Sequence, residues 1–167
     1  MCTHATCTSN TTLAIGAVSA WMQGNAFVYG TLMCEDVLKR LIRRVPLMKP
    51  AVLQGYSRFK VKGAVYPAII ATTPDALVQG QVLFELSADE LKILDQYETS
   101  EYERLSVMPT LEDASQVAAD VYVWKTELKE GLLQEPWLYE EWCQHHMQQW
   151  VSKLAPNEAH PGAVRRD

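Results

Sequence analysis

A series of five strand-like runs fills the middle of the chain, and it constrains the fold more than any other feature. Each run is rich in β-branched or other apolar residues, and Gly or Pro turn signals separate the runs. The runs span residues 52–59, 65–71, 78–86, 103–108 and 118–125. Helical patterns interrupt the series without alternating regularly with the strands. This order predicts an α+β fold with a closed or nearly closed sheet.

Another strand, 26–29, comes before the series and leads through the turn Gly30-Thr31-Leu32 into a helical segment that ends at Pro46. The apolar residues with helical spacing are Val37, Leu38, Leu41 and Ile42. Later in the chain, Ser87 and Glu90 have the spacing of a capping box, which predicts a helix over 88–98. A last helix is expected from Trp137 to about Leu154, with aromatic residues along one side.

The chain is expected to form one domain, which we place at residues 26–154. Of its 167 residues, 48% are hydrophobic and 21% are charged, as is ordinary for one soluble domain with a single core. No apolar segment is long enough to span a bilayer. Residues 1–25 are predicted to be a flexible arm and residues 155–167 a flexible tail.

The charges are unevenly distributed. Segment 35–66 has eight Lys or Arg against two acids, whereas segment 85–142 has fifteen acids against four bases. The two segments either face each other in the fold, are simply solvated, or leave a cationic surface for phosphate or nucleic acid. Because the net charge is −5, no nucleic-acid partner is expected.

Four cysteines, at positions 2, 7, 34 and 143, are too few and too irregular for a disulfide framework, which predicts a cytoplasmic location. The apolar run 13–21 is short, and no Lys or Arg precedes Lys39, so a signal peptide is not expected. Cys34 is interpreted as a small buried hydrophobe rather than a thiol of lowered pKa.

The sequence has two groups of potential metal ligands, and no metal site is expected from either. Cys2, His4 and Cys7 lie on a Ser/Thr-rich terminus without a second cluster nearby. His145 and His146 are adjacent, so their side chains point in different directions on a helix, and the two-histidine spacing of a metalloprotease helix is absent.

Glu98 is the first candidate catalytic residue. Leu91, Leu94 and Glu98 are spaced by three and four residues, so they share one face of the predicted helix, which is apolar apart from the carboxylate. Burial without a cationic partner would raise the pKa of this carboxyl toward neutrality, as a general base or acid requires. The alternative is that Glu98 reaches solvent or pairs with a residue such as Arg104.

The second candidate is the loop that joins the strand 26–29 to the helix after it. Backbone amides at such a turn point outward together and can hold an anion such as a carboxylate. Gly30 would let a ligand approach the backbone closely.

Both candidates belong to a longer series of short motifs. In chain order these are Val28-Tyr29-Gly30-Thr31-Leu32, Leu53-Gln54-Gly55-Tyr56, Tyr66-Pro67-Ala68, Gly80-Gln81-Val82-Leu83, Leu94-Asp95-Gln96-Tyr97-Glu98, Tyr102-Glu103-Arg104 and Val121-Tyr122-Val123-Trp124. The series closely resembles the gamma-glutamylcyclotransferase-like superfamily, in particular its avirulence-induced-gene-like branch of plants and fungi. The resemblance covers about residues 27–150.

The resemblance implies a small β-barrel of about six strands with flanking helices, and a single pocket where the loop meets Glu98. In that pocket Glu98 would be the proton acceptor. The charge split would fall across the two walls of the pocket and favour acidic small molecules. The implied substrate-binding residues are Tyr29, Gly30, Thr31, Leu32, Met33, Cys34, Tyr66, Pro67 and Tyr102.

The implied activity is the release of 5-oxoproline from a γ-glutamyl small molecule, whose own α-amine attacks its γ-carbonyl. The resemblance implies no metal or organic cofactor. No membrane partner is expected, because no apolar segment is long enough to span a bilayer, and a monomer is favoured. The alternative is a non-catalytic member of the same fold that keeps the pocket to bind a small molecule or a protein.

Overall fold

Two β-sheets form the framework of residues 23–154, the part of the chain that the computed structural model describes. The larger sheet has six strands in the order β6-β8-β1-β5-β2-β7, and the smaller has three in the order β4-β3-β9. In the larger sheet β1 and β8 run parallel, while its other pairs are antiparallel. The strands are β1 (Gly24–Val28), β2 (Met48–Gln54), β3 (Tyr56–Val61), β4 (Pro67–Ala71), β5 (Leu77–Leu86), β6 (Tyr102–Val107), β7 (Thr110–Leu111), β8 (Ala119–Trp124) and β9 (Leu132–Leu133).

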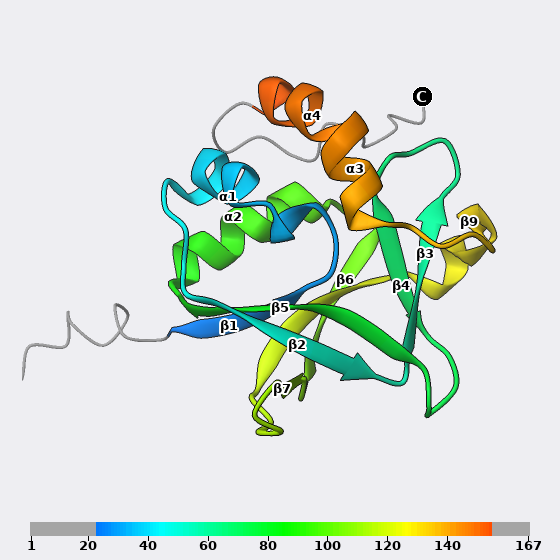
Figure 1. The fold of residues 1–167 in the computed structure, drawn as a ribbon, viewed down its shortest axis with the longest axis horizontal. Helices are drawn as coiled ribbons and strands as arrows, with labels where there is room; N and C mark the ends of the chain where they lie inside the picture. The colour runs from blue at the N-terminus through cyan, green and yellow to red at the C-terminus, as the bar shows by residue number, and fades with distance from the viewer. Residues whose placement is uncertain (1–22, 155–167) are drawn as a thin grey trace, which may run out of the picture.

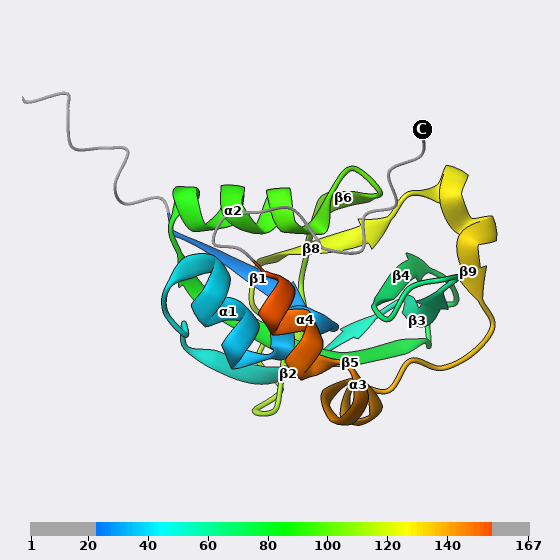
Figure 2. The same ribbon diagram turned by 90° about the horizontal axis from the view of Figure 1, so that it is seen from above.

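The α-helices gather at one side of the larger sheet (Figure 1). Viewed from above, they lie over β1 and its neighbours, whereas β3, β4 and β9 stand to one side (Figure 2). The α-helices are α1 (Glu35–Ile42), α2 (Ala88–Glu98), α3 (Tyr139–His145) and α4 (Met147–Lys153), and the 3₁₀ helices are η2 (Thr31–Met33) and η3 (Thr126–Gly131). No helix in residues 23–154 is both long and apolar enough to cross a membrane.

The α+β class and the six-stranded sheet are confirmed, but the expected barrel is wrong because the sheet is open. Its edge strands β6 and β7 share no ladder, and β7 has only two residues. Three further strands form the smaller sheet instead of completing a barrel.

Two of the predicted elements are each divided in the structure. The run 52–59 is broken by Gly55, whose φ of 88° turns the chain between β2 and β3, so these strands enter different sheets. The helix expected over 137–154 is broken at His146, which has a φ of −127° and separates α3 from α4. As a result each short helix buries one tryptophan, Trp142 or Trp150.

Alternation along β1 divides the apolar residues between two cores. Ala26 and Val28 point to the core beneath the helices, and Phe27 joins Tyr29, just beyond the strand, in a second core. The chain therefore leaves β1 at the boundary between the two cores. The domain was predicted to begin at residue 26, and β1 begins two residues earlier, at Gly24. The predicted flexible tail 155–167, residues 1–22 of the arm, the run 13–21 and the group Cys2, His4 and Cys7 lie outside the described residues.

Candidate active site

A pocket opens where the chain leaves β1, and its empty space is about 320 Å³ including open solvent at the mouth. It is lined by Phe27, Val28, Tyr29, Gly30, Thr31, Leu32, Tyr66, Pro67, Glu98, Tyr102 and Tyr122. Its walls combine apolar side chains with a few convergent polar groups, which is the composition of small-molecule sites.

All the predicted site residues except Met33 and Cys34 line this pocket. Met33 packs against the core beneath the helices, and Cys34 is buried at the start of α1, where burial raises the pKa of its thiol. The interpretation of Cys34 as a buried hydrophobe is thus confirmed. Tyr122 in β8 was missed, because the sequence holds no local signal that brings this strand beside the loop.

Glu98 is the last residue of α2 and is half-buried. Leu94 on the same face is fully buried and Leu91 packs against the core, as the spacing predicts. Desolvation by the surrounding protein raises the pKa of the Glu98 carboxyl to about 8. The alternative partner Arg104 instead faces Asp95 at 3.3 Å and Asp120 at 3.6 Å. Within the described residues, Glu98 therefore lacks the cation that would hold it ionised.

The backbone directly after Glu98 is strained. Thr99, which follows α2, has φ 66° and ψ −176°, a region that is favourable for glycine and costly for a β-branched residue. Such strain persists only where the surrounding structure enforces it. The chain direction at Glu98 is therefore set by the fold and not by local preference.

The loop opposite Glu98 offers unpaired amides. Its short helix η2 is closed by two bonds, from Met33 N to Gly30 O at 3.0 Å and from Cys34 N to Thr31 O at 3.1 Å. Within residues 23–154, the N–H groups of Gly30, Thr31 and Leu32 have no carbonyl acceptor. These donors are free to bind an anionic or carbonyl oxygen in the pocket.

Gly30 is required by packing. A Cβ atom at this position would lie 2.8 Å from Cγ of Pro67 and 3.0 Å from its Cδ, closer than side-chain atoms normally approach. The contact brings the start of β4 against the loop. Two predicted site segments are thereby held together.

A buried set of hydrogen bonds connects the loop to two helices. The Thr31 and Tyr97 hydroxyls lie 2.7 Å apart, and Trp150 Nε1 donates to the Tyr97 hydroxyl at 2.9 Å. Tyr97 immediately precedes Glu98. The two hydrogen bonds therefore hold the loop, the end of α2 and α4 in fixed positions relative to one another. Sequence reasoning missed Tyr97 and Trp150, because they bind the loop from behind and do not line the pocket.

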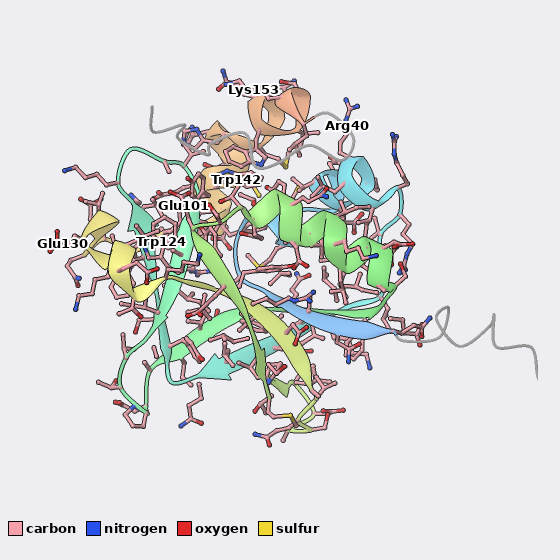
Figure 3. The ribbon with its side chains drawn as sticks, turned by 180° about the vertical axis from the view of Figure 1, so that it is seen from behind. Arg40, Glu101, Trp124, Glu130, Trp142 and Lys153 are labelled. Atoms are coloured by element: carbon pink, nitrogen blue, oxygen red, sulfur yellow. The ribbon has the colours of Figure 1, made fainter. Side chains whose placement is uncertain are left out.

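Tyrosines make up much of the polar wall. Tyr29 donates to the main-chain carbonyl of Tyr122 at 2.7 Å, and Tyr102 donates to that of Pro67 at 2.9 Å. Burial raises the pKa of both phenols well above 10, and burial with the nearby carboxylates of Glu101 and Glu98 raises the pKa of Tyr66 to about 12. These groups are neutral donors near pH 7. Glu101 lies on the turn that follows α2 (Figure 3).

The charge split does not extend to the pocket walls, because Glu98 is the one charged residue among those that line it. Because no Lys or Arg lines the pocket, its walls do not support the expected preference for acidic molecules. Instead, pairs such as Arg44 with Glu90 at 2.6 Å and Lys60 with Glu135 at 3.5 Å join the cationic and acidic segments.

Within residues 23–154, no three His, Cys, Asp or Glu side chains are grouped so as to hold a metal ion.

Comparison with known families gives one match that covers most of the chain. The family described as "Gamma-glutamyl cyclotransferase, AIG2-like" matches residues 26–144. This range includes all the residues that line the pocket.

Individual proteins agree with the family match. AIG2-like protein D of Arabidopsis thaliana is 43% identical over 126 residues, which cover 74% of this chain and 82% of that protein. The solution structure of another Arabidopsis thaliana protein is 34% identical, covers 81% of this chain and 91% of that one, and superposes with a TM-score of 0.63. A solved structure named gamma-glutamyl cyclotransferase shares the fold at 15% identity, with a TM-score of 0.51 and coverage of 86% and 94%.

Proposed function

The chain belongs to the gamma-glutamyl cyclotransferase, AIG2-like family, and from this premise we propose that it converts a γ-glutamyl compound into 5-oxoproline and a free amine or amino acid. Glu98 is the proposed general base and acid. The substrate is a small molecule, and its α-carboxylate or γ-carbonyl oxygen binds the amides of Gly30, Thr31 and Leu32.

The observation that carries the proposal is the unpaired Glu98 carboxyl, which lines the same pocket as the residues with free loop amides. Burial raises its pKa from about 4.3 for an ordinary glutamate to about 8, which brings it closer to the pKa of the substrate ammonium. Proton transfer from that ammonium is thereby easier by about 5 kcal/mol than transfer to an ordinary glutamate.

The reaction proceeds within one substrate molecule. Glu98 removes a proton from the α-ammonium, and the freed amine attacks the γ-carbonyl carbon to form a five-membered ring. Collapse of the tetrahedral intermediate breaks the bond to the leaving nitrogen, which receives a proton from Glu98, and the surplus proton on the ring nitrogen then passes through the same carboxylate to the released amine. The ring becomes 5-oxoproline, and the protein recovers its starting protonation state.

The pocket contributes by orientation and by fixed donors. Holding the glutamyl chain in its bent conformation removes much of the entropic cost of ring closure. The loop amides are already in place within η2, so they bind a developing oxyanion with little reorganisation. Neutral tyrosine hydroxyls leave Glu98 as the proton-accepting group among the lining residues.

The test is a 5-oxoproline assay with the full chain on three substrate classes: glutathione, other γ-glutamyl amino acids and γ-glutamylamines. We expect turnover of at least one class by the wild type and a loss of about 10²–10⁴-fold in Glu98→Gln. Equal turnover by the two proteins would overturn the role of Glu98. Absence of 5-oxoproline from all three classes would overturn the proposed activity and favour the non-catalytic binding function.

A further inference from the structure

Arg58 contacts the substrate loop from outside the pocket. It lies in β3, and its guanidinium donates to the main-chain carbonyl of Tyr29 at 2.7 Å, with a longer contact of 3.5 Å to the carbonyl of Gln79. Arg58 and Glu98 line different recesses that share no lining residue. A half-buried cation is therefore bound to the backbone of the loop without entering the pocket itself.

The shape of the peptide group turns this contact into a constraint on Gly30. The described residues contain no cis peptide bonds, and in a planar trans peptide the C=O and the following N–H point in opposite directions. Because Arg58 holds the Tyr29 carbonyl, the Gly30 N–H of the same peptide must point away from Arg58. Gly30 lines the pocket, and its N–H has no carbonyl acceptor among residues 23–154.

A charged donor on the carbonyl also strengthens the amide at the other end of the peptide. Hydrogen bonds from ionised donors are shorter and stronger than neutral ones, and successive bonds polarise each other. The 2.7 Å contact from Arg58 thus makes the Gly30 N–H a better donor to an anion.

Trp137 holds the guanidinium in this position. The Arg58 carbon Cζ lies 5.4 Å from the centre of the Trp137 ring, within the range of a cation–π contact. Trp137 is 5% exposed, and its Nε1 donates to the carbonyl of Val65 at 2.9 Å. The planar guanidinium is therefore held between a fixed indole ring and the loop.

We propose that Arg58, seated on Trp137, is a positioning residue that fixes the Tyr29–Gly30 peptide so that the Gly30 N–H binds the α-carboxylate of the substrate. The proposal rests on the proposed function. Through the peptide, Arg58 supplies the effect of a positive charge, although no cationic side chain lines the pocket. Arg58 acts through the peptide and does not touch the substrate.

The variants Arg58→Met, Arg58→Lys and Trp137→Leu test the proposal, with Lys60→Met as the control. Lys60 is on the same strand and pairs with Glu135 at 3.5 Å, so its loss removes a neighbouring cation without altering the loop. We expect KM for the γ-glutamyl substrate to rise about tenfold or more in Arg58→Met, with a smaller change in kcat. KM should rise less in Arg58→Lys and Trp137→Leu, and KM of Lys60→Met should equal that of the wild type.

NMR of the Gly30 amide gives a readout that does not depend on turnover. In the wild type we expect its resonance to shift on titration with 5-oxoproline, and Arg58→Met should change its position before any ligand is added. A folded Arg58→Met with an unchanged Gly30 resonance would overturn the positioning role, as would an unchanged KM. If the wild type releases no 5-oxoproline, the proposed function fails, and the Gly30 resonance still decides whether Arg58 orients the amide.

Discussion

Two glutamates eight residues apart on α2 have opposite environments. Glu90, near the start of the helix, has a side chain that is 14% exposed, accepts from the Ser87 amide at 2.8 Å and binds Arg44 at 2.6 and 2.8 Å. Burial alone would raise its pKa, but the bonds from Arg44 and Ser87 lower it below the ordinary value. Glu98, at the end of the helix, has no such partners among the described residues, and its pKa is raised to about 8.

The difference shows that burial does not determine the state of a carboxylate, because its partners do. At Glu90 the fold supplies a cap and a cation, which makes the residue structural. At Glu98 it supplies apolar neighbours and neutral phenols, which leaves proton affinity available for chemistry. The predictions below test this contrast, from the largest expected effect to the smallest.

The same substitution at the two positions should give opposite results. Glu98→Gln should lower kcat for 5-oxoproline release by about 10²–10⁴-fold, since the proton acceptor is lost. Glu90→Gln keeps an oxygen for the cap and should leave kcat unchanged. The check is kcat for both variants on the substrate that the wild type uses, and an equal loss in both would remove the contrast.

The pH dependence of kcat/KM should report the free Glu98 carboxyl. Because only the ionised form accepts a proton, kcat/KM should fall about tenfold per pH unit below about 8 and level off above it. Glu90→Gln should follow the same curve. A profile that stays flat between pH 6 and 8 would contradict the raised pKa.

Stability should depend on pH with opposite signs at the two residues. Folded Glu98 keeps its proton up to about pH 8, whereas the unfolded chain releases it near 4.5, so unfolding free energy falls as pH rises through this window. The slope is at most about 1.4 kcal/mol per pH unit. Glu90 contributes stability above its unfolded pKa that is lost as pH falls through its lower folded pKa.

Urea unfolding at several pH values separates the two contributions. Glu98→Gln should flatten the decline between pH 5 and 8 and be more stable than the wild type at pH 9. Glu90→Gln should keep that decline. If unfolding free energy fell as steeply with pH in Glu98→Gln as in the wild type, the decline would come from another titrating group.

Thr99→Gly should relieve the strained backbone behind Glu98. Relief of about 1–3 kcal/mol, less the entropic cost of glycine of about 0.5–1 kcal/mol, predicts a net gain in stability of about 1 kcal/mol. Turnover should fall a few-fold because the carboxylate is held less firmly. Ala114, which also has a positive φ of 64°, provides the control, since Ala114→Gly should gain stability without losing activity.

Arg44→Met should give the smallest effect. It removes the cation from Glu90 and should lower the unfolding free energy by about 1 kcal/mol or less, because the Arg44 side chain is 43% exposed. The pH near 8 at which the limb of the kcat/KM profile levels off should not change. Movement of that limb would show that the two ends of α2 are coupled.

The sequence predicted those parts of the site that depend on local spacing. Helical spacing places Leu91, Leu94 and Glu98 on one face wherever the helix packs. The sequence alone therefore predicted a carboxylate on an apolar helix face. The loop after β1 was likewise identified by a strand, a glycine and a helix in succession.

The remaining features depend on contacts between distant segments. The positive φ of Gly55 cannot be seen in a strand-like run that continues on both sides of the glycine, and closure of a sheet depends on which edges pair. Arg58 contacts a carbonyl 29 residues away, and Trp150 binds a hydroxyl 53 residues away, so no local pattern could reveal either contact.

The contact between Gly30 and Pro67 has a consequence for how relatives should be sorted. Because a side chain at Gly30 would collide with the Pro67 ring, the glycine serves folding whether or not the protein has retained an activity. A Tyr-Gly-Thr-Leu signature therefore diagnoses the architecture, and a genome survey based on it alone would not separate enzymes from non-catalytic members of the fold. The unpaired carboxylate at the position of Glu98, which costs stability, is the better marker of chemistry.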